Sequence, residues 1–360
     1  MASPRPVRIP KGGIRPREAV MRMQPYSPPT AGRDGKLRLD FNENTVGCSP
    51  RVIEFLRQQL RAGGLAVYPE YADTKQALGE FFGVTPEQFL LTNGTDEAIQ
   101  VFINTYVNGG DEVVLLRPSY AMYRFYAQVA GAAIHEIDYC PPQMDFPLEE
   151  LLKAITPQTR AVLIANPNNP TGTGAPLQAI ERILKRARKA AVFIDEAYYE
   201  FCGVTALPLI DEIPNLFVSR TFSKVYGMAA MRIGCLFSNP ANIAYLHKAQ
   251  SPYSVNSVAA LAVQEAVRDR AYIENYVAEV LAARELLCVR LEKLGISYVP
   301  SSANFVLMNA GRRAVALRDT LRDRGILVRD RSYEVAGHVR ITIGTREQTR
   351  QLLDALEEIW

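Results

Sequence analysis

Histidines are scarce in this chain of 360 residues: only His135, His247 and His338 occur, and they do not cluster with the cysteines. The five cysteines are themselves scattered, odd in number and free of Cys-x-x-Cys pairs. A metal site of the zinc type is therefore not expected. A disulfide framework is equally excluded, so we expect a reduced, cytoplasmic setting with the cysteines as small core residues.

Long apolar runs and excess charge are also missing. No segment is apolar for long enough to span a bilayer. The basic, Pro- and Gly-rich stretch 1–29 lacks the apolar run of a signal peptide, so an extended arm is expected there. A net charge of only +3 implies no nucleic acid or other polyanion as a partner. The 48% of hydrophobic residues is enough for a large core in one or two domains.

Short apolar runs alternate with helical patterns between about residues 88 and 238. The runs typical of buried strands are QFLLTNG, DEVVLL, TRAVLIANP, KAAVFIDEA and NLFVSRTF. This alternation predicts an α/β fold whose large domain has a mostly parallel central sheet flanked by helices. Functional residues in such sheets gather at the carboxyl ends of the strands.

The composition changes near residue 250, where two long helical patterns begin and are followed by short strands and helices. We therefore predict an N-terminal arm over residues 1–45, a large domain over 46–248 and a small α+β domain over 249–360. The arm is expected to pack with the small domain.

Unusual polar residues follow four of the predicted strands. In LTNGTDEA, Gly94 and Thr95 stand where a helix begins, and the free N–H groups of such a start suit a phosphate. An ordinary capped helix is the alternative. Asp96 and Glu97 suit the helix dipole but would repel a phosphate unless their side chains point away. In ANPNNPTG, a rigid turn could present an asparagine to an oxyanion, or could be a turn and no more.

The other two strand ends carry charge. Asp195 ends a buried strand, so its carboxylate needs a cationic or hydrogen-bonding partner. An ordinary salt bridge or a helix N-cap is the alternative to a functional role. Lys224 lies between Thr221, Ser223 and Arg232, a cationic and partly desolvated place that lowers the pKa of an amine and makes it nucleophilic. The alternative is a surface lysine.

One cofactor, pyridoxal phosphate, accounts for all four strand ends. Its aldehyde would form a Schiff base with Lys224, and Asp195 would keep its ring nitrogen protonated. Arg232 and the helix that begins near Gly94 would hold its phosphate.

A series of motifs runs in order along nearly the whole chain. They are NEN (42–44), YPE (68–70), NGTDE (93–97), PSYAMY (118–123), NPNNPTG (166–172), DEAYYEF (195–201), RTFSK (220–224), MRIG (231–234), ANF (303–305) and VRITIGT (339–345). With this series, the chain resembles the histidinol-phosphate aminotransferase family, among the fold-type I, class I and II, pyridoxal-phosphate-dependent aminotransferases.

The resemblance implies a role for each matching residue around the cofactor. Lys224 is similar to the Schiff-base lysine and proton shuttle, and Asp195 to the partner of the ring nitrogen. Asn169 and Tyr198 resemble donors to the phenolic oxygen, and Tyr120 resembles the aromatic ring stacked on the cofactor. The residues similar to a phosphate cradle are Gly94, Thr95, Asp96 through its backbone, Thr221 or Ser223, and Arg232. Tyr68 is similar to a tyrosine that reaches the cofactor of a neighbouring subunit, which implies a homodimer.

On the substrate side, the resemblance implies that Arg340 binds a carboxylate or phosphate, with Arg329, Tyr26 and Asn44 beside it. For Arg329 the alternative is a surface salt bridge with Asp330 or Glu334.

The activity so implied is ping-pong transamination between histidinol phosphate and 2-oxoglutarate, in histidine biosynthesis. An aromatic amino-acid aminotransferase, in which Arg340 alone binds the carboxylate, is the main alternative. Phosphothreonine decarboxylation and a cofactor-binding protein without catalysis are further alternatives, and an intact set of Lys224, Asp195 and Arg232 argues against the last.

Overall fold

The computed structural model describes residues 13–25, 30–61 and 63–360. A sheet of seven strands has the order β2-β8-β7-β6-β5-β3-β4. Its strands are β2 (Phe89–Thr92), β3 (Glu112–Arg117), β4 (Ala133–Asp138), β5 (Thr159–Ala165), β6 (Ala191–Asp195), β7 (Leu216–Thr221) and β8 (Gly234–Phe237). The neighbouring pairs from β4 to β7 are parallel, whereas β8 runs antiparallel to both β7 and β2.

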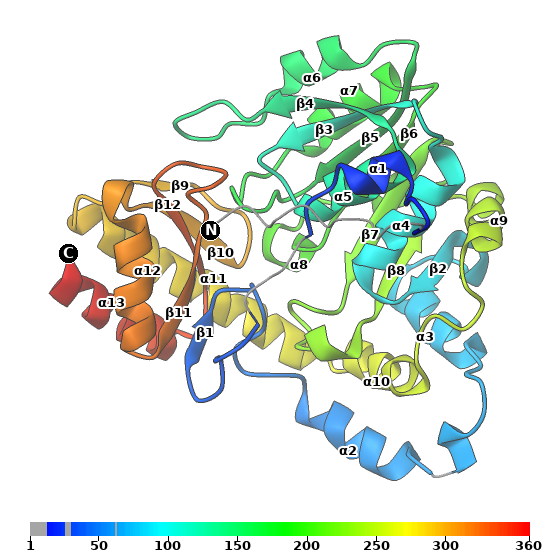
Figure 1. The fold of residues 1–360 in the computed structure, drawn as a ribbon. Helices are drawn as coiled ribbons and strands as arrows, with labels where there is room; N and C mark the ends of the chain where they lie inside the picture. The colour runs from blue at the N-terminus through cyan, green and yellow to red at the C-terminus, as the bar shows by residue number, and fades with distance from the viewer. Residues whose placement is uncertain (1–12, 26–29, 62) are drawn as a thin grey trace.

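A second sheet of five strands has the order β1-β11-β12-β10-β9. These strands are β1 (Leu37–Leu39), β9 (Tyr298–Val299), β10 (Phe305–Asn309), β11 (Ile326–Asp330) and β12 (His338–Thr342). In Figure 1 this sheet, with blue β1 beside orange and red strands, lies apart from the green and cyan large sheet. The predicted α/β fold with a smaller second lobe is confirmed.

The described helices are α1 (Glu18–Met21), α2 (Pro50–Gln59), α3 (Ala72–Phe82), α4 (Gly94–Tyr106), α5 (Ala121–Ala130), α6 (Leu148–Ala154), α7 (Leu177–Arg186), α8 (Tyr199–Cys202), α9 (Pro240–Ala249), α10 (Ser257–Arg268), α11 (Arg270–Lys293), α12 (Ala314–Asp323) and α13 (Arg346–Ile359). Helix α7 shows why such segments fold, because its Ile180, Ile183 and Leu184 are buried on one side. Among the described helices, none is both long and apolar enough to cross a membrane.

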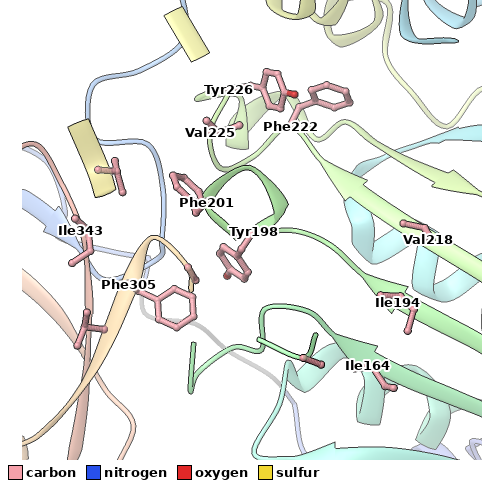
Figure 2. Close-up of a cluster of buried hydrophobic side chains, with 14 of the residues drawn as sticks. Ile164, Ile194, Tyr198, Phe201, Val218, Phe222, Val225, Tyr226, Phe305 and Ile343 are labelled. Atoms are coloured by element: carbon pink, nitrogen blue, oxygen red, sulfur yellow. The ribbon is translucent and has the colours of Figure 1, made fainter. Parts of the chain in front are cut away.

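The core is shared by the two sheets. One cluster of buried side chains includes Ile164, Ile194 and Val218 from the large sheet and Phe305 from the small one. Figure 2 shows Tyr198 between them, and its ring meets that of Phe305 edge to face with centroids 5.2 Å apart. Apolar packing therefore fixes the small sheet against the carboxyl ends of the large one.

Within the arm predicted over residues 1–45, β1 pairs in parallel with β11 of the small sheet, whereas α1 packs against α5 of the predicted large domain. The exact domain boundaries stay a prediction. Helix α10 shows how the parts interlock: it belongs to the predicted small domain, yet it packs against α2 and α3.

Candidate active site

The strands of the large sheet that run in one direction end at a common edge. Asp195 is the last residue of β6 and Thr221 the last of β7, while Gly94 follows β2 and Asn169 follows β5. Between this edge and the small sheet lies a cavity of about 610 Å³. The predicted site residues in its lining are Thr95, Asp96, Tyr120, Asn169, Asp195, Tyr198, Thr221, Ser223, Lys224, Arg232, Arg329 and Arg340.

Lys224 is the amine of this cavity. It lies just after β7, and its Nζ donates to the carbonyl oxygen of Phe41 at 3.2 Å. Burial, together with the guanidiniums of Arg340 and Arg232, lowers the pKa of Lys224 to about 8. A neutral and nucleophilic amine is therefore well populated near pH 8.

Asp195 is held by two hydroxyl groups. The hydroxyl of Tyr123 donates to Oδ2 at 2.7 Å, and that of Ser219 donates to Oδ1 at 2.8 Å. Burial raises the pKa of Asp195 to about 6, while these two hydrogen bonds favour the charged form. A cationic group in the cavity would act in the same direction as the hydroxyls and hold the carboxylate ionised.

Two further donors lie above the strand ends. The hydroxyl oxygen of Tyr198 accepts from Nδ2 of Asn42 at 3.0 Å, which leaves the tyrosine proton free to donate. Oδ1 of Asn169 accepts from Nη1 of Arg340 at 2.5 Å, so the amide nitrogen of Asn169 keeps its donors. Both side chains can therefore donate to one oxyanion.

A concave group of donors surrounds the start of α4. Gly94 has a φ of +73°, and a Cβ there would clash with the guanidinium of Arg232. Oγ1 of Thr95 is buried without a hydrogen-bond partner among the described residues. Nη1 of Arg232 donates to Oγ of Ser223 at 3.4 Å. Together with the helix dipole, these groups suit a phosphate.

The carboxylate of Asp96 does not stand in the way of an anion. It accepts from the hydroxyl of Tyr120 at 2.7 Å, and it lies 3.5 Å from Nη2 of Arg232. The carboxylate is therefore engaged with these two partners, and the backbone N–H groups of the first helical turn stay available to a phosphate.

The opposite end of the cavity is rich in guanidiniums. Arg329 of β11 and Arg340 of β12 are direct partners in the antiparallel register. Like charges placed opposite each other destabilise a sheet, and burial lowers the pKa of Arg340 to about 10. Such a local conflict indicates a binding function for an anion. The alternative pairing of Arg329 is not used, because Asp330 lies 3.7 Å from Arg318 and Glu334 pairs with Arg331.

Two of the predicted site residues, Asn44 and Tyr68, are not in the lining of the cavity. Tyr26 falls outside the described residues. The amide of Asn44 is turned to the backbone, since Nδ2 donates to the carbonyl of Val225 at 2.9 Å and Oδ1 accepts from the N–H of Val46 at 2.8 Å. Tyr68 is 74% exposed, away from the cavity.

The sequence reasoning missed Tyr123, Asn42 and Arg331, all of which line the cavity. Tyr123 of α5 lies three positions after Tyr120, which caps the start of that helix, so helical spacing could have placed both on one side. Arg331 lies two positions after Arg329, which in an extended chain puts both on one side. No comparable local signal separates Asn42 from Asn44.

These residues fit pyridoxal phosphate. An amine for its aldehyde, a carboxylate for its ring nitrogen and a phosphate cradle meet at one edge as Lys224, Asp195 and the group around Arg232. The unpartnered hydroxyl of Thr95 is a feature that a bound phosphate would use, and the missing side chain of Gly94 lets the guanidinium of Arg232 lie close to the start of α4.

Comparison with known proteins agrees with this geometry. The family model described as aminotransferase class I and II matches residues 34–356. The chain belongs to this family. It is 35% identical to the histidinol-phosphate aminotransferase of Symbiobacterium thermophilum, over 95% of this chain and 97% of that protein. The resemblance drawn from the ordered motifs is confirmed.

Solved structures of the family give the same fold. The histidinol-phosphate aminotransferase of Sinorhizobium meliloti, in complex with pyridoxal 5'-phosphate, is 26% identical, with a TM-score of 0.83 over 90% of each chain. The aspartate aminotransferase of Thermus thermophilus with maleate is also 26% identical, with a TM-score of 0.79 over 90% of this chain and 92% of that chain. The fold therefore does not determine the substrate, which depends on the side chains that line the cavity.

Proposed function

We propose that this protein is a pyridoxal-phosphate-dependent transaminase that moves an amino group between histidinol phosphate and 2-oxoglutarate. The observation that carries the choice of substrate is the pair Arg329 and Arg340, in register at the end of the cavity that holds Lys224. A planar guanidinium pairs with a carboxylate or a phosphate through two parallel hydrogen bonds. Arg340 can thus accept the carboxylate of glutamate, and Arg340 together with Arg329 can accept the phosphate of histidinol phosphate.

The residues of the chain supply the remaining steps of the proposed reaction. The bound cofactor supplies an electron sink for the carbanion formed at the reacting carbon. Nζ of Lys224 takes the proton from the reacting carbon of the amino donor and, in the second half-reaction, delivers a proton to the reacting carbon of the oxo acid, for which a pKa of about 8 is well matched near neutral pH. Tyr123 and Ser219 orient the carboxylate of Asp195, while Arg340 is anchored through Nη2 to the carbonyl of Asp40 at 2.7 Å.

A substrate panel on the wild type and on Arg329→Ala tests the proposal. Single-turnover rates would be measured with histidinol phosphate, phenylalanine, tyrosine, histidine, phosphothreonine and glutamate at equal concentration. The wild type should prefer histidinol phosphate. Arg329→Ala should lower kcat/KM for that substrate by roughly 10- to 150-fold, since a charge-assisted hydrogen bond is worth about 1.5–3 kcal/mol. The glutamate half-reaction should change much less.

A matched control is Arg322→Ala, which removes an exposed guanidinium that pairs with Asp319. It should leave every rate unchanged. Equal losses for all substrates with Arg329→Ala, or none, would favour the alternative in which Arg340 alone binds the carboxylate of an aromatic amino acid. Release of CO₂ from phosphothreonine would favour the decarboxylase.

We also propose that the protein is a cytoplasmic homodimer. The exposed rings of Tyr68 and Tyr253 stack with centroids 4.3 Å apart, and Leu65 and Val67, just before Tyr68 in the chain, are 61% and 66% exposed. Exposed apolar residues gathered in this way are typical of an interface. The five free cysteines of the described chain are in keeping with a reducing compartment.

Mixing two inactive or weakened variants tests the shared site. Hybrid dimers of Lys224→Ala and Tyr68→Phe should contain one site with both native side chains, so that cofactor affinity at this site returns to the wild-type value. The measurement is a cofactor titration of the purified hybrid beside each parent. A monomer with full activity at the assay concentration would refute the assignment of Tyr68.

A further inference from the structure

A third guanidinium, that of Arg331, lines the same end of the cavity as Arg329 and Arg340. Arg331 follows β11 directly, and its N–H donates to the carbonyl of His338 at 2.9 Å, which extends the pairing with β12 by one step. Side chains two positions apart on an extended chain point to the same side. Three cations therefore converge where one would serve a carboxylate.

Arg331 is buried, and its hydrogen bonding is incomplete. The residue is only 6% exposed, and its Nη2 pairs with the carboxylate of Glu334. Its Nε is buried and has no hydrogen-bond partner among the described residues. A buried donor without a partner is costly, so this N–H would gain a partner if the side chain of Arg331 turned toward an anion at this end of the cavity.

Glu334 is the counter-charge of the group. A tight turn sets it against Arg331, because the N–H groups of Glu334 and Val335 both donate to the carbonyl of Arg331 at 2.9 Å. Burial raises the pKa of Glu334, against the opposing effects of Arg331, Arg340 and Arg329. One carboxylate thus faces three guanidiniums, and the group keeps a positive excess.

The two substrates of the proposed reaction bring different charges to this end. A carboxylate brings one negative charge, whereas a phosphate ester brings about 1.5 to 2 at pH 7. We infer that Arg331 is a specificity-determining residue. It breaks its pair with Glu334 and binds the anion when that anion is a phosphate dianion, and it stays paired with Glu334 when a carboxylate is bound. This inference rests on the proposed function for the identity of the phosphate substrate.

A purely structural role for the pair predicts something different. If Arg331 and Glu334 served only to hold the turn in place, loss of either would loosen the cavity and weaken the binding of every anion. If Arg331 exchanges partners, the two losses change phosphate affinity in opposite directions. Loss of Glu334 frees Arg331 and raises the affinity, whereas loss of Arg331 removes a phosphate-binding group and lowers it. The sign of the change therefore separates the two roles.

The experiment is a calorimetric titration of the holoenzyme with inorganic phosphate and with acetate. Arg331→Gln should weaken phosphate binding by at least about 10-fold and acetate binding by less than about 3-fold. Glu334→Gln should tighten phosphate binding by about 3- to 10-fold. The double variant should bind phosphate as weakly as Arg331→Gln. Arg324→Gln is the control, because it breaks an Arg–Glu pair with Glu358 on the exposed surface of the same lobe.

Several outcomes would overturn the inference. Weaker phosphate binding in Glu334→Gln, or equal losses for phosphate and acetate in Arg331→Gln, would identify the pair as a structural clamp. If Arg331→Gln proves unstable, Glu334→Gln decides alone, because a loosened fold does not tighten a ligand. Turnover of histidinol phosphate is measured separately on the wild type. Its absence beside the expected phosphate pattern would refute the proposed substrate and leave the role of Arg331 standing.

Discussion

Lys224→Ala should lower the single-turnover rate of the holoenzyme by about 10⁴-fold or more, the upper end of what a positioned proton-transfer group contributes. The variant loses both the nucleophilic amine and the base, and Lys224 is the only lysine in the described lining of the cavity. The measurement is the change in cofactor absorbance after glutamate is added. Borohydride reduction of the wild type, followed by peptide mapping, should leave the cofactor attached to Nζ of Lys224.

Lys75 offers a matched control for this experiment. Burial also lowers the pKa of Lys75, but its amine lies over the ring of Phe89, outside the cavity lining. Lys75→Ala should therefore keep both the turnover and the label. A label on Lys75, or on any lysine other than Lys224, would disprove the assignment.

Asp195→Asn should lower the single-turnover rate by roughly 10²- to 10³-fold, as expected when one preorganised electrostatic contact to developing charge is lost. An amide cannot hold the ring nitrogen of the cofactor in its cationic form, so the electron sink is weakened while the phosphate cradle stays intact. Cofactor affinity should consequently fall much less than the rate. Stopped-flow absorbance and a cofactor titration on the same preparation measure the two effects.

Asp138→Asn is the control for position in the sheet. Asp138 also ends a parallel strand, β4, at the same edge, but it is paired with Arg117 at 2.6 Å on the surface. It should leave both measurements unchanged. A normal rate in Asp195→Asn would mean that this carboxylate is not the partner of the ring nitrogen.

The centre of the fold could be predicted from the sequence because burial on both faces leaves a clear pattern. Strand β5 is buried at all but one of its seven positions, and the run TRAVLIANP shows this directly. Strand β4 was not singled out, because this edge strand alternates between exposed and half-buried residues. Strand β8 is a run of four residues, and its antiparallel direction depends on pairing with β2 and β7 rather than on its own pattern.

The site divides in a similar way. Lys224, Asp195 and Gly94 could be found because each interrupts or follows an apolar strand with chemistry that the strand does not need. Tyr123 could not be assigned in this way, since its partner Asp195 lies 72 residues further along the chain. Arg331 was hidden in a charged segment, RDRSYE, where the sequence does not tell a buried cation from surface charge.

The small sheet combines a strand from the first part of the chain with strands from the last part, and this determines the order in which the two sheets can form during synthesis. Arg340 donates to the carbonyl of Asp40 across 300 residues, and β1 pairs with β11. A ribosome makes the chain from its N-terminus, and folding units form in that order. The described strands of the large sheet have all been made by Phe237, whereas β11, the only neighbour of β1 among the described strands, has not yet been made. During synthesis, the cofactor-side residues at the edge of the large sheet can thus come together well before the arginines of the small sheet that would bind a substrate.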